Sequence, residues 1–224
     1  MKKQLLFIFV IVLSCISAMA QGYNRGAVEY GRLFDGAVST EYHKVIYSLN
    51  SISAEYTHGF RLGKGNPGVI ELGGQINYMF ANRDNTEKPY IFGGILDLDP
   101  TRNPSRATNL LGLTVPVRLL LELNAGRGFK IVPFVGLYAR CYLVGKEQLK
   151  YYTRHHPEDN YTKVTKSEDI LGESLKRFMA GWNIGLGLEW HRMSVRASFG
   201  TTFYHDKASM NPTKTLTVGA GYKF

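Results

Sequence analysis

The 224-residue sequence predicts an all-β protein, an eight-stranded antiparallel transmembrane up-and-down β-barrel. Three observations predict this fold class. The chain begins with an export signal, apolar and polar residues alternate through most of the remainder, and short and long connections alternate between these segments. Alternation with a period of two is typical of strands that have one apolar face.

The first residues carry the features of a signal peptide. A short basic start, Met1–Lys3, precedes an almost purely apolar run, Leu5–Ile16, and the small-x-small pattern Ala18–Ala20 follows. Signal peptidase reads this order of features. The apolar run is shorter than the roughly 20 residues that a transmembrane helix needs. We therefore expect residues 1–20 to be a cleaved signal peptide and residues 21–224 to form the barrel domain.

The two cysteines leave one alternative open at the N-terminus. Val12–Cys15 loosely resembles a lipobox, in which Cys15 would carry a lipid, although Leu13 fits that pattern poorly and the Ala-x-Ala site follows closely. If Cys15 leaves with the signal peptide, Cys141 is the only cysteine in the mature chain. An intramolecular disulfide is then excluded.

Period-two alternation is clearest in the last strand. Leu216, Val218, Ala220, Tyr222 and Phe224 share one face, opposite Thr215, Thr217, Gly219, Gly221 and Lys223. Six further segments repeat the pattern: 51–62, 69–80, 109–123, 130–145, 178–190 and 193–203. The first strand, where the pattern is weaker, is expected near Gly26–Phe34.

The connections support an even strand count. Tight turns are predicted at Gly63–Gly68, Ala125–Gly128 and His191–Arg192. They alternate with long polar segments at 82–107 and 147–177 and a medium one at 206–212. Outer-membrane barrels have short turns on one side and long loops on the other. Eight strands are the count consistent with this alternation.

Charges of both signs, diluted by glycine, lie on the polar face of these strands. In a small membrane barrel the apolar side chains face lipid and the polar ones fill the lumen, where buried charges must be paired. We expect a lumen charge network formed by Glu55, Arg61, Glu71, Arg118, Glu122, Arg140, Glu189 and Arg196. Mutual structural pairing is favoured over a role in passing protons or ions.

Aromatic side chains fall at both ends of the apolar face. Trp190, Tyr222 and Phe224 lie near the predicted short turns, and Tyr78, Phe80, Phe178 and Phe203 lie near the predicted long loops. Rings of this kind suit the headgroup level of a membrane. These positions predict two aromatic girdles.

The segment Thr215–Phe224 looks like the C-terminal assembly signal of outer-membrane barrels, with Tyr222 and Phe224 as its aromatic residues. Over residues 22–224 the chain resembles the small outer-membrane β-barrel domain family, the OmpA- and OmpX-like barrels of porin-family type. The resemblance implies a Gram-negative outer-membrane location, with the barrel-assembly machinery as folding partner. It implies no particular activity, because fold does not specify function.

The formal charge of +9 is spread over turns and loops rather than gathered in a stripe. Nucleic acid is therefore disfavoured as a partner, and outer-membrane lipid or lipopolysaccharide is favoured. We expect a structural or interaction role, with an extracellular ligand contacting the loops 82–107 and 147–177. Three alternatives stay open: a narrow pore for small solutes, a lipid A-modifying enzyme, and a soluble periplasmic ligand-binding β-barrel.

Candidate chemistry is sparse. His205 and Ser209 are the catalytic candidates for the enzyme alternative, but Lys207 occupies the position where lipid A deacylases carry serine. The pair His155–His156, with Glu158 and Asp159 nearby, is weak evidence for a metal site because ligands must converge. The sequence has no nucleotide-binding or cysteine-cluster motif, so we expect no cofactor, no metal and no enzymatic activity.

Overall fold

The computed structural model describes residues 22–40, 43–63, 65–84, 97–98, 105–154, 160, 162–171, 176–203 and 212–224. The predicted signal peptide, residues 1–20, lies outside the described residues. The same holds for Cys15 and for the loop candidates His155, His156, Glu158, Asp159, His205 and Ser209. None of the described residues forms a helix long and apolar enough to cross a membrane.

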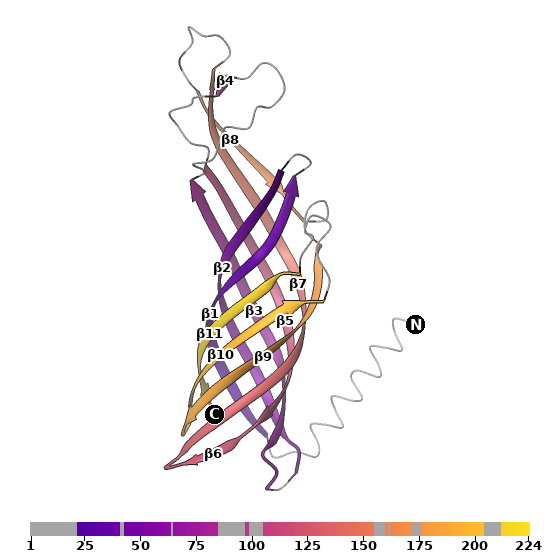
Figure 1. The fold of residues 1–224 in the computed structure, drawn as a ribbon, viewed down its shortest axis with the longest axis vertical. Helices are drawn as coiled ribbons and strands as arrows, with labels where there is room; N and C mark the ends of the chain where they lie inside the picture. The colour runs from indigo at the N-terminus through magenta and orange to yellow at the C-terminus, as the bar shows by residue number, and fades with distance from the viewer. Residues whose placement is uncertain are drawn as a thin grey trace, which may run out of the picture.

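The described chain forms a closed antiparallel barrel of eight strands, as the sequence predicts (Figure 1). The wall consists of β1 (Gly22–Thr40), β2 (His43–Arg61), β3 (Gly68–Asp84), β5 (Ser105–Leu121), β7 (Phe129–Arg154), β9 (Phe178–Trp190), β10 (Met193–Thr202) and β11 (Lys214–Lys223). A short strand, β6 (Leu123–Gly126), continues the line of β5 along β7. Two more short strands, β4 (Asp97–Leu98) and β8 (Thr162–Asp169), pair with the distal end of β7.

Pairing of the first strand with the last closes the barrel. β1 and β11 pair in register from Arg25 opposite Lys223 to Phe34 opposite Lys214. At the end of the ladder the Asn24 amide donates to the Phe224 carbonyl over 3.1 Å, and the Phe224 amide donates back over 2.9 Å. The wall of the described barrel therefore has no open edge, which is how a barrel satisfies its backbone without water.

The predicted tight turns are present at one end of the barrel. Between β6 and β7, Gly126 and Gly128 have φ angles of 89° and 81°, a left-handed conformation that glycine adopts without steric cost. The turns after β2 and β9 lie at the same end as Gly22 and Phe224. We call this the short-turn end, and the opposite end the long-loop end.

Three sequence predictions about strand limits are wrong. The first strand spans Gly22–Thr40 rather than Gly26–Phe34, and the segments 82–107 and 147–177 are not loops throughout. β3 continues to Asp84 and β5 starts at Ser105, while β7 continues to Arg154 and β8 pairs with it. Polar residues stand on both faces of these extensions, so the period-two signal of a strand with one apolar face is weak there.

The two surfaces of the barrel wall are chemically inverted relative to a water-soluble protein. Large apolar side chains point outward and are exposed, as with Val28 at 62%, Leu137 at 57% and Leu188 at 56%. Charged side chains point inward and are buried, and Arg25 and Glu71 are each 0% exposed. This inversion is the pattern of a barrel whose outer wall contacts lipid.

Candidate functional site

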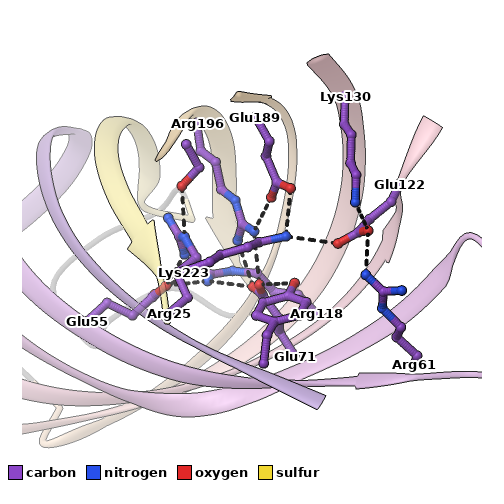
Figure 2. Close-up of polar contacts among 12 residues, drawn as sticks. Arg25, Glu55, Arg61, Glu71, Arg118, Glu122, Lys130, Glu189, Arg196 and Lys223 are labelled. Carbon is purple, nitrogen blue, oxygen red and sulfur yellow. Dashed lines mark hydrogen bonds and ion pairs between the residues drawn. The ribbon is translucent and has the colours of Figure 1, made fainter. Parts of the chain in front are cut away.

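The centre of the lumen is occupied by Glu55 and two arginines (Figure 2). Arg118, from β5, donates to both carboxylate oxygens of Glu55, from β2, over 2.7 and 2.6 Å. Arg25, from β1, donates to the same carboxylate over 2.9 Å and reaches Ser194 on β10 over 3.2 Å. One carboxylate thus links β1, β2 and β5, and Arg25 extends the connection to β10.

A second arginine–carboxylate pair lies beside the first (Figure 2). Arg196, on β10, donates to the two oxygens of Glu71, on β3, over 2.6 and 2.9 Å. The Tyr23 hydroxyl donates to Glu71 over 2.7 Å, and an Arg118 nitrogen lies 3.9 Å from Glu71, which connects the two pairs. Bidentate pairs of this geometry are the strong form of charge-assisted hydrogen bond.

The network continues to the short-turn rim. Lys223, on β11, bridges Glu122 and Glu189 over 2.8 and 2.6 Å, and Lys130 donates to Glu122 over 2.6 Å. Glu122 lies in the break between β5 and β6, outside the wall strands.

An inward-facing aromatic ring packs between the two arginines. Phe134, on β7, has the guanidinium carbons of Arg118 and Arg196 at 5.8 and 5.7 Å from its ring centroid. It belongs to a small apolar cluster with Val69, Leu120 and Val132. Cation–π contact of this kind adds attraction while excluding water from the ion pairs.

Toward the long-loop end the ion pairs give way to a small polar cavity of about 50 Å³. Glu29 borders it, with its carboxylate hydrogen-bonded by Gln75 over 2.8 Å. Because one water needs about 10–15 Å³ on this measure, the space suits a few waters rather than a solute. The Asn183 amide oxygen on its wall is buried and has no hydrogen-bond partner among the residues that the structure describes, as a hydrated cavity would allow.

An apolar cluster closes the lumen above this cavity. Its members come from six wall strands and from the segment after β8: Leu33, Leu49, Met79, Ala81, Leu110, Tyr142, Ile170, Leu171 and Met179. Seen from the long-loop end, the described lumen is therefore filled by apolar packing first and by ion pairs below it.

The structure brings together six of the eight expected side chains inside the lumen, joins Arg61 to them at the exposed rim through Glu122, and leaves Arg140 apart. Glu55, Glu71, Arg118, Glu122, Glu189 and Arg196 form the connected system. Arg61 is a rim residue, with a side chain 47% exposed and 3.5 Å from Glu122. Arg140 lies higher in the barrel, where it donates to Thr114 over 3.0 Å and covers the Tyr138 ring.

Four further participants were missed by sequence reasoning: Arg25, Glu29, Lys130 and Lys223. Lys223 lies on the predicted polar face of the last strand, so its charge could have indicated that it belongs to the lumen network. Arg25 and Glu29 share a face because they are separated by four residues in a strand, a signal hidden by the imprecise limits of the first strand.

The strands differ greatly in length, and the difference builds a projection at the long-loop end (Figure 1). β10 and β11 have 10 residues each, whereas β7 has 26. About 9–11 residues suffice for a tilted strand to cross a bilayer. The distal half of β7, paired with β8 and β4, therefore reaches beyond that thickness.

An apolar outer wall around a filled polar lumen distinguishes a membrane barrel from a water-soluble β-barrel. The chain has the fold of a small outer-membrane β-barrel. Its aromatic residues lie where girdles are expected: Trp190 and Tyr222 at the short-turn end, and Phe178 and Phe203 at the long-loop end, are all exposed on the outer wall.

Solved structures similar to this chain are distant in sequence. Ail of Yersinia pestis, in complex with the heparin analogue sucrose octasulfate, is 11% identical over 91% of this chain and 99% of its own, with a TM-score of 0.43. Neisserial surface protein A is 9% identical over 91% and 97%, with a TM-score of 0.39. The N-terminal β-barrel domain of Pseudomonas aeruginosa OprF is 13% identical over 91% and 100%, with a TM-score of 0.32. No protein-family model and no curated protein matches the chain.

Proposed function

We propose that this chain is an integral outer-membrane barrel with a structural or interaction role, exercised through the strands that project from its long-loop end. The observation that carries the proposal is the outer wall, on which large apolar side chains are exposed all the way around. Residues from every wall strand contribute, including Tyr30, Ile52, Ile76, Leu113, Leu137, Ile184, Val195 and Val218. In water such a surface would aggregate, whereas in a bilayer it is solvated by acyl chains.

The projection is the surface that we assign to partner contact. β8 pairs with β7 along one edge, and its side chains are solvent-exposed except Val164, which is half-buried. An exposed strand edge can accept an added strand from a partner. Lys163 and Lys166 also serve a simpler purpose, since edge lysines oppose uncontrolled strand pairing. A specific extracellular partner would have to accommodate these two charges.

The narrow-pore alternative is weakened by the contents of the lumen. The described lumen holds the apolar cluster, the small cavity and the ion-pair network in series, each formed by inward-facing wall residues. An eight-stranded barrel is only wide enough for side chains to fill. We expect no steady conductance from the purified protein in a planar bilayer.

The remaining alternatives have less support. A soluble periplasmic barrel would bury its apolar faces against each other, and here they point outward. The lipid A-modifying alternative depends on His205 and Ser209, which are outside the described residues, so it stays a prediction that altered lipid A mass on expression would test. We also propose Tyr222 and Phe224 as the barrel-assembly signal, since both side chains are exposed on the outer wall.

Two measurements test the membrane proposal. Membrane fractions run unboiled and boiled in mild detergent should migrate differently, because a closed barrel keeps its shape until heated. The second measurement introduces Ser167→Cys, on β8, or Ala125→Cys, in β6, into a Cys141→Ala background. On intact cells a membrane-impermeant maleimide should label the β8 cysteine and leave the β6 cysteine unlabelled until lysis. Labelling of both or neither on intact cells, or release of soluble protein without a gel shift, would contradict the proposal.

A further inference from the structure

The seam between β1 and β11 differs from the other seams of the barrel wall in how its strands are connected. It joins the first wall strand to the last, so no turn holds the two edges together. Each other described seam joins wall strands that follow one another along the chain. Because closing a long segment costs more entropy than closing a hairpin, the closure seam depends more strongly on noncovalent contacts.

Lys223 is the inward-facing residue at the C-terminal end of this seam. Tyr222 and Phe224, on either side of it, are exposed on the outer wall, whereas the Lys223 side chain is 13% exposed. The Lys223 amide donates to the Arg192 carbonyl over 2.7 Å, and Phe224 exchanges two backbone hydrogen bonds with Asn24. The backbone therefore fixes Lys223 beside β1 and directs its side chain into the short-turn mouth of the lumen.

The ammonium group of Lys223 joins the last strand to three other parts of the wall (Figure 2). It donates to Glu122, in the break between β5 and β6, over 2.8 Å and to Glu189, on β9, over 2.6 Å. It also lies 3.9 Å from the ring centroid of Tyr23, on β1. In the ring of wall strands β5 is four places from β11 in either direction, so the contact with Glu122 crosses the barrel.

Other residues hold both carboxylates in place to receive this ammonium group. The Glu122 amide donates to the Pro67 carbonyl over 2.8 Å, and the Glu122 carboxylate accepts from Lys130 over 2.6 Å. The Glu189 carboxylate accepts from Arg196 over 3.5 Å. Both glutamates are buried, at 9% and 2% exposed, and like charges that converge in a buried site repel one another. A cation placed between them by the last strand removes that repulsion.

We propose that Lys223 holds the barrel closed, because its ammonium group, bound between Glu122 and Glu189, keeps β11 paired with β1. The C-terminal segment then has a separate role on each face. Tyr222 and Phe224 face outward, where we have proposed an assembly signal, and Lys223 faces inward and secures the closed seam. The inference rests on the membrane placement proposed above. It assigns one residue of the lumen network to the control of local seam opening.

The test measures amide hydrogen exchange in wild type, Lys223→Gln and Lys130→Gln, each folded into lipid vesicles. Lys130→Gln is the matched control, since it removes the same charge from Glu122 but breaks a contact between residues only eight positions apart. Lys223→Gln should accelerate exchange about tenfold in peptides covering 22–30 and 216–224, as expected for loss of a charge-assisted hydrogen bond. Exchange in 69–80, on β3, should change less than about twofold, and Lys130→Gln should change all three peptides less than about twofold.

Unchanged exchange at the seam in Lys223→Gln would overturn the inference, as would equal acceleration in 69–80, which would indicate a global loss of stability. Equal acceleration at the seam by Lys130→Gln would also overturn it, because the charge on Glu122 would then matter more than the link to the last strand. The unboiled gel shift is recorded for each protein, and its absence in wild type would contradict the membrane proposal instead. If Lys223→Gln does not fold, Glu189→Gln replaces it and should accelerate exchange at the seam about threefold, since Lys223 keeps Glu122.

Discussion

The two halves of the lumen are filled in different ways. Toward the short-turn end, carboxylates and guanidinium groups pair directly, and Glu55 is held by Arg25 and Arg118 with no exposure of its side chain. Toward the long-loop end, Glu29 is equally well inside the wall, but it is hydrogen-bonded by the neutral Gln75 and borders a cavity. An apolar cluster then completes that half. One half is charge-paired, whereas the other combines a small polar cavity with apolar packing.

This difference predicts where a single substitution should change the free energy of unfolding most. A buried ion pair is not intrinsically more stabilising than apolar packing, yet removing one partner leaves an uncompensated charge in a low-dielectric interior. Replacing a carboxylate beside a hydrated cavity should destabilise the protein less, because water can form the hydrogen bonds that the substitution removes. The same chemical change should therefore reduce stability much more in the charge-paired half than in the half that contains the cavity.

The largest effect is expected from Glu55→Gln. The substitution keeps the size of the side chain but leaves Arg25 and Arg118 without their shared carboxylate. We expect a loss of about 3–5 kcal/mol in the free energy of unfolding. Urea titration of the protein in lipid vesicles, followed by tryptophan fluorescence, measures it. A loss below about 1 kcal/mol would mean that the lower half is hydrated like the upper half.

A smaller effect is expected from Leu110→Ala, in the apolar cluster of the upper half. Leu110 is 3% exposed and packs with Met79, Tyr142 and Leu171. Truncation removes apolar burial and leaves a void, which costs about 2–3 kcal/mol, at the lower end of the range for Leu→Ala substitutions. The same urea titration applies. An unchanged midpoint would show that the cluster does not contribute to closure of the upper half.

The success of the sequence predictions also differs between regions of the molecule. Alternation was strong wherever a strand had lipid on one side and lumen on the other, so the barrel class, the eight strands and the tight turns were predicted correctly. It failed where Arg32 interrupts the lipid-facing side of β1, and where β8 is exposed to solvent on both faces. Period-two patterns report a difference between two environments and vanish when the environments are alike.

The candidate site was predictable as a set of charges but not as a set of partners. The polar face contained Glu55, Glu71, Arg118 and Arg196, yet which guanidinium meets which carboxylate depends on strand register and barrel closure. The cluster of Met79, Leu110 and Tyr142 was hidden for a different reason. Inward positions near the long-loop end are apolar, so the inward face is not uniformly polar along a strand.

A direct comparison of the two halves comes from Glu29→Gln. Glu29 is 8% exposed, as buried as a core residue, but its hydrogen-bond partner Gln75 is neutral and can rotate its amide to accept. We expect the free energy of unfolding to change by less than about 1 kcal/mol. The change is measured beside Glu55→Gln under identical conditions. Equal losses for the two variants would contradict the distinction between a charge-paired half and a half that contains a polar cavity.

The smallest effect is expected from Arg61→Gln, which tests where the lower half ends. Arg61 was predicted to belong to the lumen network, but its side chain is 47% exposed and its nitrogen is 3.5 Å from Glu122, whose carboxylate also accepts from Lys130 and Lys223. Exposed pairs contribute about 0–1 kcal/mol, and here two closer cations remain, so we expect a loss below about 0.5 kcal/mol. Because an exposed pair is screened, added salt should abolish even this difference between wild type and variant. A loss as large as that of Glu55→Gln would mean that the strongly coupled ion-pair network extends to the rim and includes Arg61.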